Sequence, residues 1–267
     1  MRCASFYYYK LSENQKRIYL HMKKHLIEET SPLPYIIPSE LASEQELLNA
    51  YEALFFDTCS PLLPAMNIVG AYTRGNRSVL ALREGFEISY PSEEDINALN
   101  RKVAEFSEPS KSLSPYDLAI YIARFLYENT PYHLRSGGVG ESPIEALMQH
   151  QAYCTGIART TRLLSGFRFL CVRGHLRKEF SLVDTEDDSV GTPHVWNAFF
   201  NQDEPVFFDI CSCIRVVNNT SIADELKNEM YRDNYKNGTF RNPIFYSLDL
   251  LKKKYVLKEE RLWLQEK

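Results

Sequence analysis

The order of the local sequence patterns constrains the fold of this chain of 267 residues more than any other feature. Helix signals fill the chain up to about residue 165, whereas the segments that follow are short, aromatic and rich in β-branched residues. Runs of helices followed by runs of strands are typical of α+β folds, in which helices pack on an antiparallel sheet. We therefore predict an α+β fold.

The helix signals lie mainly at the helix starts. Ser12, Ser43 and Ser142 each precede a Gln or Glu by three residues, which is the spacing of a capping box. Pro115 and Pro143 stand at the first helical position, where proline is favoured. The predicted helices cover residues 12–29, 43–56, 92–107, 115–129, 142–149, 154–165 and 222–231.

Three later segments have the composition of strands. They read "FRFLCVRG" at 167–174, "HVWNAFF" at 194–200 and "PVFFDICSC" at 205–213. The dipeptide Gln202–Asp203 and the charged stretch "DTEDDSVGT" at 184–192 separate them and are predicted to form a turn and a loop.

The composition excludes several classes of protein. Apolar residues make up 44% and charged residues 25% of the chain, which is ordinary for a globular protein. The net charge is -4 and no long run of Lys and Arg occurs, so we expect no nucleic-acid partner. The N-terminal stretch becomes polar too early for a signal peptide, and no run of about eighteen apolar residues is present. We expect a cytoplasmic protein with reduced thiols, without a membrane partner.

The cysteines give no sign of a metal centre. There are six, and no two have the C-x-x-C spacing of a structural zinc site. We expect no metal and no organic cofactor.

Cys154 stands where a predicted helix begins, and two interpretations are open. A free cysteine is most often a small buried hydrophobe. Alternatively, the partial positive charge of a helix N-terminus favours the reactive thiolate. Gly156, in the first turn, would leave room either for a substrate or for a closely packed backbone.

His194 and Asp209 lie on successive predicted strands, so they come side by side if these strands pair. A thiol, an imidazole and a carboxylate are the groups that acyl transfer needs, as nucleophile, proton carrier and orienting group. Each residue alone also has a packing interpretation, since a histidine on an aromatic strand is often a hydrogen-bonded core residue. A carboxylate among phenylalanines is costly to bury without a partner, and that partner need not be a histidine.

The combined pattern resembles the transglutaminase-like cysteine enzymes of the papain-like superfamily, in the bacterial type with a helical N-terminal region. The resemblance lies in "AYCTGIARTTRLLSGFRFLCVRG", "HVWNAFF" and "PVFFDICSC", which follow one another in the family's order. The stretches "LSENQKRIYLHM", "ELLNAYEALFFDTCS" and "YPSEEDINALN" are similar to the helical region that precedes the core in such proteins.

The resemblance implies a role for each residue of the motifs. Cys154 is then the nucleophile, His194 the general base and acid, and Asp209 the orienting group. The backbone N–H of Cys154 helps to form the oxyanion hole. A second donor comes from a residue just upstream, and the candidates are Gln149, Gln151 and Tyr153. Gly156, Trp196 and Asn197 are implied to shape or pack the cleft.

The resemblance also implies a division of the chain and a reaction. A mainly helical region at 1–109 is expected to pack on a papain-like catalytic core at 110–267. The reaction is acyl transfer from a peptide or protein amide through a Cys154 thioester, as in a peptidase, an amidase or a transglutaminase. Two alternatives stay open: a binding module without turnover, and a structural protein in which the three residues only pack. The sequence leaves the substrate, the acceptor and the oligomeric state undetermined.

Overall fold

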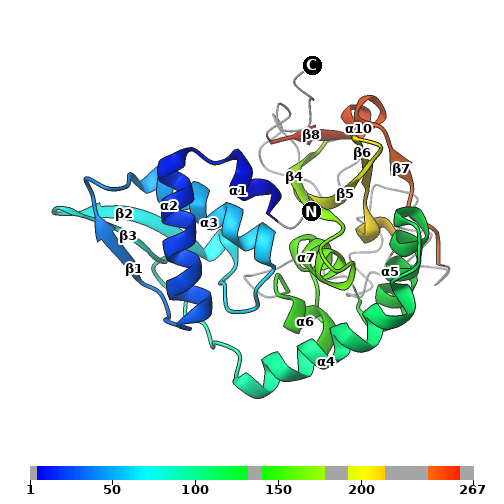
Figure 1. Ribbon diagram of the computed structural model, residues 1–267, viewed down its shortest axis with the longest axis horizontal. Helices are drawn as coiled ribbons and strands as arrows, with labels where there is room; N and C mark the ends of the chain where they lie inside the picture. Colours follow the sequence, from blue (N-terminus) through cyan, green and yellow to red (C-terminus); the bar gives the residue numbers. More distant parts are fainter. Residues whose placement is uncertain (1–4, 132–139, 178–191, 214–239, 259–267) are drawn as a thin grey trace. The chain divides into compact units, whose positions relative to one another are not determined.

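The computed structural model of the chain describes residues 5–131, 140–177, 192–213 and 240–258 (Figure 1). It combines helices with antiparallel sheets, which confirms the predicted mixture of the two. The chain divides into two compact units, Met1–Asn100 and Arg101–Lys267. The division falls inside helix α4 (Glu93–Ser110), ahead of the predicted boundary at 109, and the predicted packing of the N-terminal region on the core stays a prediction.

The first unit contains helices and a three-stranded antiparallel sheet of order β1-β3-β2. Its main elements are α1 (Phe6–Lys10), α2 (Glu13–Met22), a π-helical continuation (Lys23–Glu28), β1 (Tyr35–Pro38), α3 (Glu44–Thr58), a 3-10 turn (Met66–Ile68), β2 (Val69–Arg74) and β3 (Arg77–Leu82). Helix α3 contacts both other helices and strands β2 and β3. Leu47, Tyr51, Leu54 and Phe55 of α3 are buried at helical spacing, so this helix centres the core of the unit. The sheet corrects the expectation of strands only after residue 165.

The second unit carries a five-stranded antiparallel sheet of order β7-β6-β5-β4-β8 (Figure 1). Its elements after α4 are α5 (Pro115–Asn129), α6 (Pro143–Met148), α7 (Cys154–Leu164), β4 (Leu170–Leu176), β5 (Thr192–Asn201), β6 (Glu204–Phe208), a 3-10 turn (Ile210–Cys213), β7 (Phe245–Tyr246), α10 (Leu248–Lys254) and β8 (Tyr255–Leu257). Helix α7 packs on β5 and β4 and also contacts α5 and α6. The predicted helices at 115–129, 142–149 and 154–165 are confirmed within one residue at each end.

The exit from α7 explains why β4 begins later than predicted. Gly166 and Phe167 both adopt positive φ, and their N–H groups return to carbonyls of the last helical turn. This is the Schellman ending, in which glycine is favoured. Because these residues complete the helix end, the strand begins at Leu170 instead of 167.

The strand predicted at 205–213 is wrong in its second half. Strand β6 ends at Phe208, and Ile210–Cys213 form a 3-10 turn. The reason is local: the Asp209 carboxylate accepts a hydrogen bond from the backbone N–H of Cys211, at 3.0 Å. Side-chain bonds of this kind replace the ladder bonds of a strand.

The turn between β5 and β6 is confirmed at Gln202–Asp203. Both residues have positive φ, and Asn201 pairs with Glu204 on either side of them. This is the geometry of a two-residue hairpin loop. The helix predicted at 222–231 and nearly all of the loop predicted at 184–192 lie outside the described residues. No helix in the described part of the chain has both the length and the apolar character needed to cross a bilayer.

Candidate active site

Helix α7 begins at Cys154, directly after the extended residue Tyr153. No side chain caps this helix, so the partial positive charge of its N-terminus is not offset by a capping side chain. Cys154 is only 2% exposed. The five described cysteines are all buried, and no disulfide joins any two of them; they are Cys59, Cys154, Cys171, Cys211 and Cys213.

Gly156 brings another backbone segment close to the start of α7. A Cβ atom at this position would lie 2.0 Å from the carbonyl oxygen of Gly140. The same carbonyl accepts a hydrogen bond of 2.8 Å from the N–H of Tyr153. Of the two interpretations of Gly156, the structure therefore supports the closely packed backbone.

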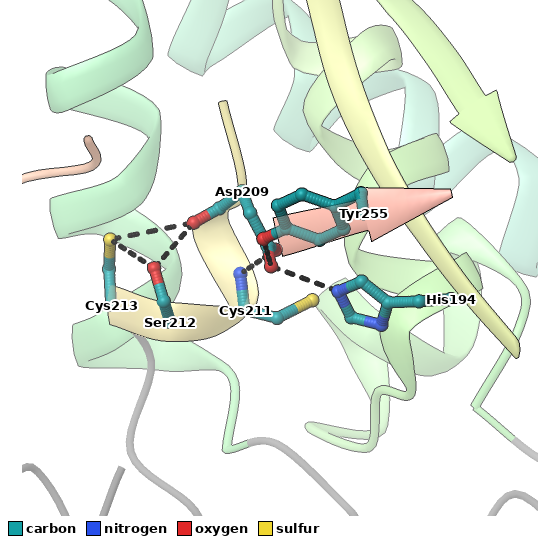
Figure 2. A network of polar contacts seen from close by, with 6 residues as sticks. All are labelled: His194, Asp209, Cys211, Ser212, Cys213 and Tyr255. Atoms are coloured by element: carbon teal, nitrogen blue, oxygen red, sulfur yellow. Dashed lines mark hydrogen bonds and ion pairs between the residues drawn. The ribbon is translucent and has the colours of Figure 1, made fainter. Parts of the chain in front are cut away.

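His194 and Asp209 meet as a buried pair between β5 and the end of β6 (Figure 2). The Nε2 atom of His194 lies 2.9 Å from Oδ2 of Asp209, and the side chains are 4% and 2% exposed. The register of the sheet explains the meeting, because β5 and β6 pair as antiparallel neighbours. The predicted side-by-side placement of these two residues is thus found in the structure.

Asp209 accepts further hydrogen bonds on both carboxylate oxygens. Its Oδ1 accepts from the backbone N–H of Cys211 at 3.0 Å, and its Oδ2 accepts from the hydroxyl of Tyr255 at 2.8 Å. A carboxylate with several donors remains ionised even when it is buried. Tyr255 is a part of this network that the sequence analysis missed.

The pair shifts the pKa values of both partners in opposite directions. Burial alone would lower the pKa of the His194 imidazole, but the charge and hydrogen bond of Asp209, together with the Cys154 side chain, raise it to about 10. Burial would raise the pKa of Asp209, whereas His194, Lys254 and Tyr255 lower it to about 2. The site therefore holds an imidazolium–carboxylate pair at neutral pH.

The Cys154 side chain lies near enough to His194 to contribute to the raised pKa of the imidazole. The structure thus brings together all three residues of the predicted constellation. Tyr153 also lies near the thiol: the charge of Cys154 is the largest cause of the raised pKa of its phenol, and burial is the next. The Tyr153 hydroxyl therefore keeps its proton and can donate.

The other two oxyanion candidates lie differently. Gln149 and Gln151 are exposed, and their backbone N–H groups both donate to the carbonyl of Glu145. The backbone N–H of Tyr153 is likewise occupied, because it donates to the carbonyl oxygen of Gly140. Among the three candidates, the side chain of Tyr153 is the one with an interaction at the Cys154 thiol.

Trp196 packs beside the imidazole. Its ring stacks on His194 with 6.1 Å between centroids and an interplanar angle of 22°, and it is 1% exposed. Its Nε1 atom has no hydrogen-bond partner among the described residues. The ring of Tyr255 lies 4.5 Å from the Trp196 ring, so the two aromatic side chains enclose one side of His194.

Asn197 connects α7 to the sheet. Its Nδ2 donates to the carbonyls of Ala158 and Leu170, at 2.9 and 3.1 Å. The side chain is 1% exposed, so both bonds are made in the core. Asn197 thus ties the helix that begins at Cys154 to the strands that carry His194.

Cys211 is a second thiol beside the pair. Ligand atoms of His194, Asp209 and Cys211 all lie within 4.8 Å of one another, and Figure 2 shows the Cys211 sulfur beside the imidazole. Nitrogen, oxygen and sulfur together suit Zn²⁺ in chemical type. However, His194 and Tyr255 already donate to Asp209 Oδ2 and the Cys211 backbone to its Oδ1. We therefore interpret the group as a hydrogen-bonded pair with a neighbouring thiol, not as a metal centre.

The thiol of Cys211 is held neutral. Burial, followed by the charges of Asp209 and Cys154, raises its pKa well above the ordinary range. The thiolate is the nucleophilic form of cysteine. Cys211 is therefore poorly suited to attack a carbonyl, and Cys154 is the better candidate.

Comparison with known proteins gives a structural neighbour but no sequence relative. No family model matches the chain. No curated protein matches it either. A structure described as "Crystal structure of a TGase" matches with 13% sequence identity and a TM-score of 0.36, over 57% of this chain and 46% of that one. The chain spans less than half the length of that protein, and a TM-score of this size does not establish a common fold.

Proposed function

We propose that this chain is a cysteine-dependent acyl-transfer enzyme with a transglutaminase-like, papain-like core, which acts on a peptide or protein amide. The observation that carries the proposal is the buried His194–Asp209 pair, at 2.9 Å, with Cys154 interacting with the same imidazole from a helix N-terminus. Packing alone does not require an ion pair beside a thiol, because buried charges are costly.

In this mechanism Cys154 attacks the amide carbonyl carbon as the thiolate, paired with the His194 imidazolium, and forms a tetrahedral intermediate. The C–N bond then breaks, and the His194 imidazolium gives its proton to the leaving amine. Asp209 keeps the imidazole in the required orientation throughout. The product of this half-reaction is a thioester on Cys154.

Water or a second amine then attacks the thioester carbonyl carbon and gives its proton to His194, the C–S bond breaks, and Cys154 leaves as the thiolate beside the imidazolium. Attack by water releases an acid, as in a peptidase or amidase, and attack by an amine forms a new amide, as in a transglutaminase. The developing oxyanion is stabilised by the backbone N–H of Cys154 and by the Tyr153 hydroxyl, whose proton is retained beside the thiol.

The burial of Cys154, at 2% exposure, favours a second candidate function. A protein with the same core but a covered sulfur would act as a peptide- or protein-binding module without turnover. The two candidates differ in one respect: only the enzyme forms and releases an acyl group at Cys154.

The test uses an activated ester, p-nitrophenyl acetate, with intact-mass and peptide-mass detection of the acetyl group. The enzyme acetylates itself at Cys154 and releases the acetyl group faster when butylamine is added. Variants Cys154→Ala and His194→Ala abolish the labelling at this position, whereas the control Cys171→Ala, in β4, retains it. Absence of labelling in the wild-type protein, or labelling that His194→Ala leaves unchanged, contradicts the proposed function.

A further inference from the structure

Tyr255 reaches the site from a part of the chain far from Cys154 in sequence. Its hydroxyl donates to Oδ2 of Asp209 at 2.8 Å, across a separation of 46 residues. The side chain is 1% exposed. It therefore supplies a buried donor to the same carboxylate oxygen that faces His194 (Figure 2).

The ring of Tyr255 also contacts the aromatic groups of the site. It lies nearly parallel to the imidazole of His194, with 6.1 Å between centroids and an angle of 14°. It lies 4.5 Å from the ring of Trp196. The ring of Tyr255 thus lies beside the His194 imidazole, and its hydroxyl donates to Asp209, the hydrogen-bond partner of that imidazole.

Strand β8 fixes the position of Tyr255. It pairs with β4 in antiparallel register, with Tyr255 opposite Leu176 and Leu257 opposite Gly174. At Gly174 the approach is so close that a Cβ atom would lie 2.0 Å from the carbonyl oxygen of Val256. Because backbone contacts hold the strand, the hydroxyl is presented at a defined point.

The surroundings of Asp209 contain a second positive charge. Lys254, at the end of α10, is 9% exposed, and its charge acts on Asp209. Among the described residues, the titratable groups that surround Asp209 come from several elements: His194 of β5, Cys211 and Cys213 of the 3-10 turn, Tyr246 of β7, Lys254 of α10, Tyr255 of β8 and Cys154 of α7.

We propose that Tyr255 is a positioning residue of this site, whose hydroxyl keeps the Asp209 carboxylate ionised and turned toward His194. The effect on Cys154 chemistry rests on the proposed function, whereas the effect on Asp209 and His194 does not. Tyr255 acts through Asp209 and needs no contact with the substrate.

The test compares Tyr255→Phe with Tyr246→Phe. The first change removes the hydroxyl and keeps the ring. The second is a matched control, because Tyr246 lies in the field of Asp209 and its ring is 6.2 Å from that of Tyr255. Among the described residues, no hydrogen bond joins its hydroxyl to Asp209. The ¹³C signal of the Asp209 carboxyl, assigned by its loss in Asp209→Asn, is followed against pH.

In Tyr255→Phe the pH midpoint of Asp209 is expected to rise by roughly one unit, the size of one hydrogen bond to a charged group. The downfield proton signal of the His194 ring N–H is expected to broaden. Alkylation of Cys154 by iodoacetamide is expected to slow about three- to tenfold. Tyr246→Phe is expected to leave all three readouts unchanged.

An unchanged Asp209 midpoint in Tyr255→Phe overturns the proposal. A raised midpoint with an unchanged His194 signal also overturns it, because Tyr255 then does not orient the pair. If His194→Ala leaves the alkylation of Cys154 unaltered, the proposed function fails, and the two spectroscopic readouts still decide the role of Tyr255. Should Tyr255→Phe fail to fold, 3-fluorotyrosine at position 255 keeps the ring and strengthens the donor, and the Asp209 midpoint is expected to fall instead.

Discussion

The carbonyl oxygen of Gly140 lies 2.0 Å from the point where a Cβ atom on Gly156 would stand. The atom in the way belongs to the backbone, so it moves only if the whole segment moves. Gly156→Ala is therefore expected to lower the free energy of unfolding by about 2 kcal/mol, as overpacking does. Denaturant unfolding measures this loss.

A glycine in the first unit provides the control for this change. At Gly70 in β2 the nearest atom to an added Cβ is Cγ of Arg83, at 3.4 Å, which belongs to a flexible side chain. Gly70→Ala is expected to change the stability by less than about 0.5 kcal/mol. Equal losses in the two variants would contradict the close approach at Gly156.

Replacement of Asp209 by Asn should damage both stability and the state of His194. The change leaves a buried imidazole without its charge partner, which typically costs about 3 kcal/mol or more. With Asp209 gone, burial becomes the dominant effect on His194, so its pKa is expected to fall below the value of about 10 found in the pair. NMR titration of the imidazole, together with urea unfolding, checks both expectations.

The same pair predicts how stability depends on pH. The pKa of Asp209 is lowered from 3.8 to about 2, so its contribution is present above the unfolded value and is lost as the pH falls toward 2. The pKa of His194 is raised from 6.5 to about 10, so its contribution is complete below pH 6.5 and is lost as the pH rises toward 10. The His194–Asp209 interaction therefore accounts for a loss of stability at low pH and for another at high pH.

The melting temperature is therefore expected to be highest between pH 3.8 and pH 6.5, the unfolded pKa values of Asp209 and His194. Measured from about pH 3 to about pH 10, its decline above pH 6.5 should be present in the wild-type protein and absent in Asp209→Asn. Identical profiles in the two proteins would exclude the pair as the source of the pH dependence.

Cys211 is expected to react slowly although it lies beside the site. Its pKa is raised by burial and by the charges of Asp209 and Cys154, so the thiol form persists. At about pH 8, iodoacetamide should modify Cys154 at least about tenfold faster than Cys211, as peptide mass mapping can show. After unfolding in guanidinium the two rates should become similar. If Cys211 reacts faster than Cys154 in the native protein, Cys154 is not the nucleophile.

Asn197→Ala is expected to destabilise the second unit without removing any group of the proposed mechanism. The change leaves the carbonyls of Ala158 and Leu170 without this donor in the core. A loss of about 2 kcal/mol is expected from two buried hydrogen bonds. Thermal unfolding measures it. Asn201→Ala, at the exposed end of the same strand, is the control and should be nearly neutral.

Several helices of both units could be predicted because their signals are local. A serine cap and a glutamate or glutamine three residues later identify the starts of α2, α3 and α6, and each capping box is present in the structure. The end of α7 at Gly166 follows from the same kind of local rule.

The sheet of the first unit was missed although its hairpin carries a signal. Gly75–Asn76 separates two short segments with β-branched residues, which is a two-residue loop pattern, and Gly75 has positive φ. Strand β1 gives a weaker signal, since it ends in Pro38, which cannot donate to a ladder. It pairs with β3, which lies about forty residues later in the chain, and a local sequence pattern does not predict such distant pairing.

The order of the sequence motifs predicted Cys154, His194 and Asp209 as site residues, but it did not predict Tyr255. That residue lies in a short strand at the edge of the sheet, and its neighbour β4 precedes it by about eighty residues. Only the pairing of these distant strands places its hydroxyl on Asp209. The same limit applies to Cys211, whose turn forms because Asp209 interrupts the strand.

The sheet order β7-β6-β5-β4-β8 has a consequence for a chain that is still being synthesised. A growing polypeptide contains Cys154, His194 and Asp209 before the ribosome has added Tyr255. Until β8 closes its edge of the sheet, the carboxylate lacks one of its donors. The proposed nucleophile therefore exists before its surroundings are complete, and the final assembly of the site coincides with the docking of this late strand.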